Sequence, residues 1–101
     1  MIVVRDIFRL KFGQAKEATA LWKQAVEFLK KSGYGVRDVR LLTDLSGPAY
    51  YTMVLESTYD SVAQWEQAHN SVKTNAQFRQ IYQQITPLTE DGRREILSVV
   101  E

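Results

Sequence analysis

Hydrophobic and polar residues alternate over the first dozen positions of the chain. Even-numbered positions from 4 to 12 hold Val, Asp, Phe, Leu and Phe, whereas odd positions from 3 to 11 hold Val, Arg, Ile, Arg and Lys. A period of two with β-branched and aromatic residues is typical of a β-strand. We therefore predict a strand over residues 2–12, ended by Gly13, with Asp6 and Phe8 on the same face as Leu10.

The period then lengthens to that of a helix. Between residues 14 and 32, apolar residues recur at intervals of three and four, and most of the others are good helix formers. Lys30 and Lys31 suit the negative end of a helix dipole, and Gly33 suits the left-handed residue that follows a last turn. We predict a helix here, with a buried stripe made of Ala18, Leu21, Trp22, Ala25, Phe28 and Leu29.

A hairpin is expected next. Residues 35–45 and 49–57 are rich in Val, Leu and Tyr, and the turn signal Ser46-Gly47-Pro48 separates them. In the second of these strands, apolar residues occur on both faces. A strand with one face in water should instead be polar on that face.

Two shorter helices and a strand complete the pattern. Ser57, Thr58 and Asp60 are candidate N-caps for a helix that reaches about residue 70. Thr74 to Gln77 fits a capping box for a further helix, and Pro87 ends it. Residues 93–101 then predict a last strand. The apolar stripes of the two helices are Val62, Trp65, His69 and Val72, and then Phe78, Ile81, Tyr82 and Ile85.

The order strand–helix–strand–strand–helix–strand predicts one α+β domain over residues 1–101 with a ferredoxin-like fold. In that fold a four-stranded antiparallel sheet carries its helices on one face. The other face would expose Val3 and Ile7 as well as the hairpin. A second copy of the chain is the simplest cover for it, so we expect a homodimer. A monomer that exposes a few aromatic residues is the alternative.

Composition narrows the function classes. Thirteen basic and twelve acidic residues give a net charge of +1, which argues against nucleic-acid binding. An RNA-recognition motif has the same strand order, but Gly47-Pro48 precedes Ala49 without the basic residue that such a motif requires. There is no cysteine and only one histidine, so we expect no metal site. No apolar run is long enough for a membrane span or a signal peptide, and we expect a cytoplasmic protein.

Asp6, Trp65 and His69 are the residues that suggest chemistry. Asp6 should point toward the helices, and Trp65 and His69 share a helix stripe that should meet the sheet. A carboxylate and an imidazole in a partly dry cavity could act as acid and base, with Trp65, Phe8 and Tyr82 contacting an aromatic substrate. Alternatively, Trp65 belongs to the core, His69 is structural, and Asp6 pairs with a nearby arginine.

Several segments resemble one superfamily. Val4-Arg5, Leu10-Lys11 and Gly13, leading into a long helix, resemble the opening of NIPSNAP-type domains, which belong to the dimeric α/β-barrel superfamily together with small antibiotic-biosynthesis monooxygenases. Residues 59–66 are similar to its second helix, residues 74–88 to its short helix and proline-marked loop, and residues 94–97 to its closing strand. The resemblance implies a homodimer whose sheets form an α/β barrel, and a ligand cavity between each sheet and its own helices.

The resemblance also separates possible activities. Haem-degrading members use an asparagine on the first strand, a tryptophan on the second helix and a later histidine, whereas this chain has Asp6 and places His69 close behind Trp65. We therefore expect no cofactor. A cofactor-independent, monooxygenase-like enzyme that acts on an aromatic or quinone-like molecule fits better. A non-catalytic module that binds a small ligand or a protein is the alternative hypothesis.

Overall fold

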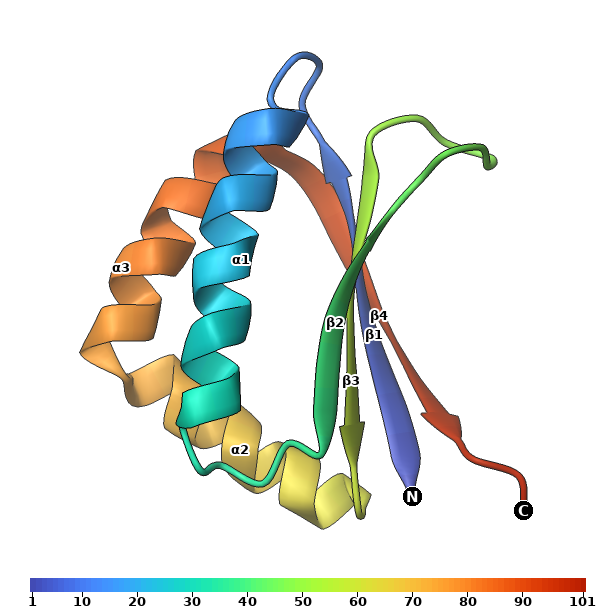
Figure 1. Cartoon of the computed structure of the whole chain (residues 1–101), viewed down its shortest axis with the longest axis vertical. Coiled ribbons are helices and arrows are strands. Elements are labelled where there is room, and N and C mark those ends of the chain that lie inside the picture. Colours follow the sequence, from blue (N-terminus) through green and yellow to red (C-terminus); the bar gives the residue numbers. More distant parts are fainter.

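Four antiparallel strands form one sheet in the order β2-β3-β1-β4, so the first and third strands lie in the centre (Figure 1). The computed structural model describes residues 1–101. β1 pairs with both β3 and β4, although they lie far from it in sequence. The strands are β1 (Ile2–Leu10), β2 (Asp38–Thr43), β3 (Thr52–Tyr59) and β4 (Thr89–Ser98).

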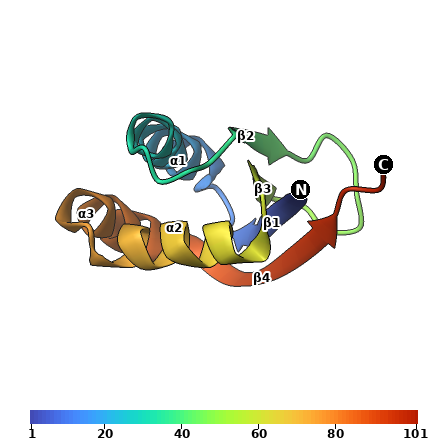
Figure 2. The same ribbon diagram turned by 90° about the horizontal axis from the view of Figure 1, so that it is seen from below.

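All helices lie on one side of the sheet, which gives the molecule two layers (Figure 2). α1 (Ala15–Lys31) and α3 (Ala76–Ile85) lie next to each other, and α2 (Val62–Thr74) continues into α3 at an angle. A short 3₁₀ turn, Thr86–Leu88, then leads into β4. The predicted ferredoxin-like α+β fold is confirmed. No helix is both long enough and apolar enough to cross a membrane.

The register fixes which strand residues face the helices. Asp6 lies opposite Leu55 on β3 and opposite Arg94 on β4, and Phe8 lies opposite Met53 and Gly92. As predicted, Asp6 and Phe8 are on the helix side. The largest fully buried side chains of this layer are Trp22, Met53, Ile85 and Val4.

Several predicted strand ends were wrong. β1 stops at Leu10, and Phe12 is 81% exposed in the following loop rather than buried with the strand. β2 covers only Asp38–Thr43. β3 begins at Thr52 instead of residue 49 because Tyr51 has a positive φ of 61°, which interrupts extended backbone. β4 runs from Thr89 to Ser98, four residues earlier than residue 93 at its start, because it pairs along the whole of β1.

The predicted helix caps were also misplaced. β3 continues to Tyr59, so Ser57 and Thr58 are strand residues, and Ser61 caps α2 by accepting a hydrogen bond from the Gln64 amide. Val62 and Tyr82, both predicted in buried stripes, are 47% and 46% exposed, and Val62 lies in the first turn of α2. α2 extends through Thr74, and Asn75 rather than Thr74 caps α3.

The outer face of the sheet combines a charged triad with apolar side chains. Glu56 lies between two arginines, with Oε2 2.9 Å from Arg5 Nε and Oε1 2.8 Å from Arg40 Nη2. Burial favours the protonated form of Glu56, but the hydrogen bonds from Arg40 and Arg5 outweigh it and keep its pKa below the ordinary value. Around this triad lie Val3, Ile7, Leu42, Val54 and Leu97, on strand positions that alternate with the helix-facing ones.

Candidate functional site

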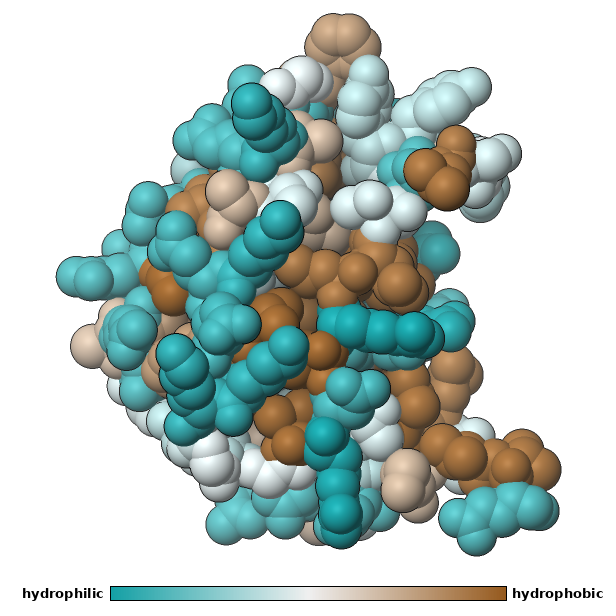
Figure 3. Space-filling view, viewed as in Figure 1, coloured by the Kyte–Doolittle hydropathy of each residue, from teal (hydrophilic) through white to brown (hydrophobic).

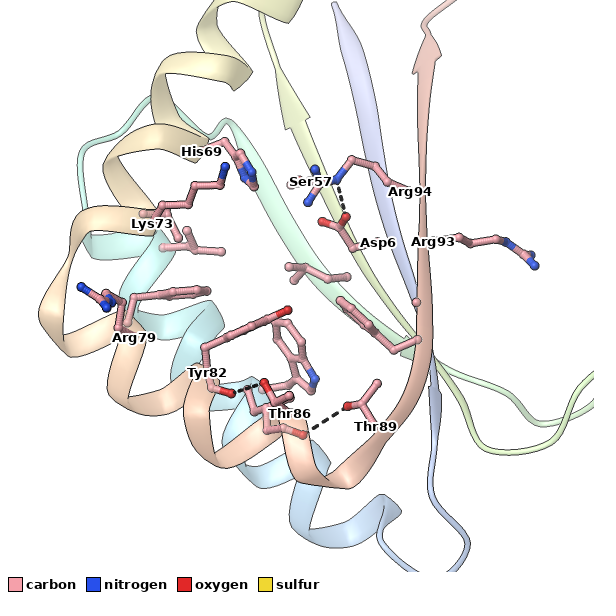
Figure 4. A pocket seen from close by; sticks show the side chains of 18 of the residues that line it. Asp6, Ser57, His69, Lys73, Arg79, Tyr82, Thr86, Thr89, Arg93 and Arg94 are labelled. Atoms are coloured by element: carbon pink, nitrogen blue, oxygen red, sulfur yellow. Dashed lines mark hydrogen bonds and ion pairs between the residues drawn. The ribbon is translucent and has the colours of Figure 1, made fainter.

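A cavity of about 810 Å³ lies between the sheet and the helices, on the side of α2, α3 and β4 (Figure 4). Aromatic side chains from several elements line it, among them Phe8 on β1, Trp22 on α1, Trp65 on α2, and Phe78 and Tyr82 on α3. Ten of its 23 lining residues are hydrophobic, and the others include several charged side chains. Apolar walls combined with convergent polar groups are the usual form of a small-molecule site.

All the residues that the sequence suggested for a site line this one cavity, namely Asp6, Phe8, Trp65, His69 and Tyr82. They come from three elements that the fold brings together. In Figure 4 the hydroxyl of Tyr82 points into the cavity and His69 lies at its upper end, opposite Arg94. Their roles in function stay a prediction.

Phe8 owes its position to a glycine on the next strand. Its ring stacks on Trp22 with a centroid distance of 4.9 Å. On the other side, the ring covers Gly92, where an added Cβ would come within 2.9 Å of the Phe8 ring. Because no real Cβ makes so short a contact, a side chain at position 92 would displace Phe8 and reshape this wall of the cavity.

Trp22 adds a polar group to an otherwise apolar wall. The residue is 2% exposed, and its indole Nε1 has no hydrogen-bond partner within the chain. A buried donor without a partner carries a free-energy cost of about 1–3 kcal/mol. The sequence predicted Trp22 only as a core residue, and no local signal marks its contact with the cavity.

His69 is held by stacking rather than by hydrogen bonds. Its ring lies on Trp65 with a centroid distance of 5.2 Å and an angle of 23° between the planes. Burial lowers the pKa of His69, and the charges of Arg94 and Lys73 lower it further, while Asp6 opposes them. A neutral imidazole with no partner in the chain is able to accept a proton.

Asp6 is paired with an arginine of the neighbouring strand. Arg94 donates from Nε to Oδ1 of Asp6 at 2.6 Å, and no hydrogen bond joins Asp6 to His69. The same guanidinium lies 5.1 Å from the centre of the Trp65 ring, within range of a cation–π contact. The alternative interpretation, in which Asp6 pairs with a nearby arginine, describes the observed contact.

Arg94 and Lys73 are the site residues that sequence reasoning missed. Arg94 was considered only as part of the closing strand, although its alternation with Ile96 puts both on one strand face. Lys73 follows His69 by one helical turn, a spacing that places two side chains on the same face of α2. No cluster of three or more His, Cys, Asp or Glu residues that could hold a metal ion is present.

Comparison with solved structures supports the fold and goes no further. The chain is similar to a NIPSNAP domain protein from Burkholderia xenovorans, with a TM-score of 0.84, 18% identity and coverage of 99% of this chain and 95% of the other. It is also similar to a NIPSNAP family protein from Agrobacterium tumefaciens, with a TM-score of 0.81, 15% identity and coverage of 99% of this chain and 93% of the other. For a variant of SnoaB, a cofactor-independent oxygenase from Streptomyces nogalater, the TM-score is 0.75 and the identity is 11%. The match covers 99% of this chain and 93% of the other.

No protein-family model and no curated protein matches the sequence. The structures above therefore define the class by its architecture: a ferredoxin-like α+β domain of the kind found in NIPSNAP and antibiotic-biosynthesis monooxygenase structures. At such low identity the shared fold does not carry over a substrate or a reaction.

Proposed function

We propose that this chain is a small enzyme that oxidises a phenolic or quinol-like aromatic molecule with molecular oxygen and without a cofactor. The observation that carries the proposal is an aromatic-walled cavity of about 810 Å³ with an unpartnered imidazole in its wall. A similar fold in a cofactor-independent oxygenase adds support by analogy.

His69 is the base in this proposal. An aromatic ring bound among Phe8, Trp65 and Tyr82 would bring its phenolic hydroxyl to the imidazole, which takes the proton. The nearby Arg94 guanidinium would stabilise the phenolate that forms. Asp6, bonded to Arg94, acts by positioning that group rather than as an acid.

The phenolate is the electron-rich species that reacts with oxygen. For a ring methylene between two phenolic rings, the balanced overall reaction is conversion of CH₂ to C=O. One oxygen atom of O₂ enters the product, and the other leaves as water with both hydrogens of the methylene. This substrate supplies all four electrons, so no external reductant is required. A quinol supplies two electrons and two protons, so its products are the quinone and hydrogen peroxide.

Oxygen uptake with polyphenolic ring-methylene compounds and quinols tests the proposal. We expect uptake above the autoxidation rate for the wild type, and a loss of about a hundredfold or more in His69→Ala, because a positioned base contributes on this order. Asp6→Asn should lose less, since Arg94 keeps its charge. Gln67→Ala, an exposed α2 substitution outside the cavity, should match the wild type. Equal rates in the wild type and His69→Ala would rule the mechanism out.

A non-catalytic ligand-binding module is the second candidate. It is favoured by a specific observation: Asp6 is engaged by Arg94, and no group orients His69 through a hydrogen bond. In that case an aromatic ligand should raise the thermal midpoint of unfolding, because it binds the native state alone, without any oxygen uptake.

We also propose that the outer face of the sheet pairs with a second copy of the chain. Leu42 and Leu97 are exposed on this face, and none of the helices covers it (Figure 2). The two-fold pairing of identical faces is the commonest way in which soluble chains cover such a surface.

A further inference from the structure

The upper end of the cavity carries more positive charge than its one carboxylate balances. Lys73 and His69 approach it from α2, and Arg94 approaches from β4 on the opposite wall (Figure 4). Burial lowers the pKa of His69 most, and both Arg94 and Lys73 lower it further, so both cations lie within electrostatic range of the imidazole. Asp6 is the carboxylate among them.

Hydrogen-bond donors remain unused in this cluster. Arg94 bonds Asp6 through Nε, and its two terminal nitrogens have no hydrogen-bond partner. Lys73 forms no ion pair within the chain. The other carboxylates of the lining lie near the start of β4, beside Arg9. Glu90 Oε2 is 3.6 Å from Arg9 Nε, and Asp91 pairs with Arg9 in the strand register.

The direction of these donors suits an anion. A guanidinium fork and an ammonium group are the protein donors that bind carboxylates most strongly. Asp6 fixes one edge of the guanidinium, and Figure 4 shows the remainder of the group directed toward His69 across the cavity. A lysine in the last turn of α2 also suits the helix dipole, but that role does not require a second cation on the opposite wall.

We propose that Arg94 and Lys73 form an anion subsite at the mouth of the cavity, and that the ligand is an aromatic carboxylate whose acidic group lies next to the phenolic hydroxyl that reaches His69, while its rings occupy the apolar interior. This inference rests on the proposed function and names the class of its substrate. Trp65 links the two parts, because its ring contacts both His69 and the Arg94 guanidinium. Asp6 is a positioning residue for the subsite.

A matched pair of ligands separates charge from shape. 2-Naphthoate and 2-naphthamide have the same rings and differ in the charge of one substituent, so calorimetric titration of both measures the subsite directly. We expect naphthoate to bind about tenfold more tightly, equivalent to about 1.4 kcal/mol, because hydrogen bonds to a charged group exceed neutral ones by this order. Added salt should reduce the difference.

Two variants assign the preference to the residues. Lys73→Gln, at an exposed position that tolerates the change, should bring the ratio of affinities close to one. Lys16→Gln, an exposed lysine of α1 outside the cavity, should leave the ratio unchanged. Circular dichroism of both variants checks that the fold is intact.

The single histidine supplies a second readout. Its Cε1 proton gives one NMR signal, so the pKa of His69 can be followed without assignment ambiguity. Naphthoate should raise this pKa by placing a negative charge beside the ring, and naphthamide should not.

The outcomes distinguish the subsite from the pocket. Equal affinities for the two ligands would overturn the anion subsite and leave the aromatic cavity standing. If neither ligand binds, the anion subsite is overturned, whereas the proposed function is decided separately by the oxygen-uptake measurement. Suppose that Lys73→Gln still binds naphthoate more tightly than naphthamide, and that naphthoate does not change the pKa of His69. The anion would then lie elsewhere, and the inference would be overturned.

Discussion

The protonation of His69 depends on residues from two strands and from its own helix. Burial disfavours the imidazolium, and Arg94 and Lys73 repel it. The attraction of Asp6 is weaker than these effects together, so the pKa of His69 is lowered. In the unfolded chain those influences are lost, and the histidine titrates near its ordinary pKa of 6.5. As the pH falls, the unfolded state therefore takes up this proton before the folded state does.

This difference predicts a pH-dependent stability. The free energy of unfolding should fall as the pH decreases from about 7 through 6.5 toward the lower folded pKa, and then stop changing on account of this group. His69→Gln should remove that part of the profile. Urea unfolding of both proteins at a series of pH values measures it. Identical profiles for the two would contradict a depressed pKa.

At the residue scale, the sequence predicted the face on which a side chain lies better than the residue that it contacts. Alternation put Asp6 on the helix side, and the helical period put His69 beside Trp65. Arg94 could not be recognised as the partner of Asp6, because the two residues are 88 positions apart and meet only through the register of β1 and β4. Lys73 was visible at one helical turn from His69, but its direction depends on how α2 packs.

At the element scale, the junction of α2 and α3 shows how one residue sets two boundaries. The Asn75 amide bonds to the Val72 carbonyl at the end of α2, and its side chain accepts from the Phe78 amide at the start of α3 at 3.1 Å. The junction turns the chain so that both helices line the cavity (Figure 1).

Asn75→Ala should therefore destabilise the protein by about 1 kcal/mol, the usual cost of losing an N-cap side chain. Thr74→Ala is the matched control, because Thr74 bonds only to carbonyls of its own helix and does not cap α3. We expect it to change stability by only a few tenths of a kcal/mol. Urea denaturation of the two variants decides between the caps, and a larger loss in Thr74→Ala would restore the capping box predicted from the sequence.

Element identity was predicted more reliably than element ends. The helical and strand periods are local properties, so the order of elements and their buried faces follow from them. The ends depend on pairing and on single backbone conformations. β4 starts early because β1 offers partners up to Leu10, and β3 starts late because of the positive φ of Tyr51.

At the scale of the whole molecule, the exposed apolar side chains include two sets. One lies on the outer face of the sheet around the Arg5–Glu56–Arg40 triad. The other lies at the tip of the loop between β2 and β3, at Leu45, and at the C-terminal end, at Val100, where Figure 3 shows hydrophobic surface. The first set combines apolar side chains with paired charges, and we expect the same face of a second copy to cover it.

We expect light scattering at micromolar concentration to give about twice the chain mass of 11.6 kDa. Leu97→Glu, at a position 44% exposed on the outer face, should shift the protein toward the monomer, because it would place a charge in the interface. Val62→Glu, at a similarly exposed 47% on the helix side, is the control and should stay dimeric. A wild-type particle with the mass of one chain would contradict the pairing.

The sequence alone determined the order of the elements, the faces that they bury, and a set of aromatic and titratable residues on those faces, because each follows from local periodicity. The tertiary structure alone decided that Asp6 accepts a hydrogen bond from Arg94, that Lys73 and Arg94 flank His69, and that a cavity remains between the layers. These features depend on strand register and on how fully side chains fill the space between sheet and helices, which are non-local properties.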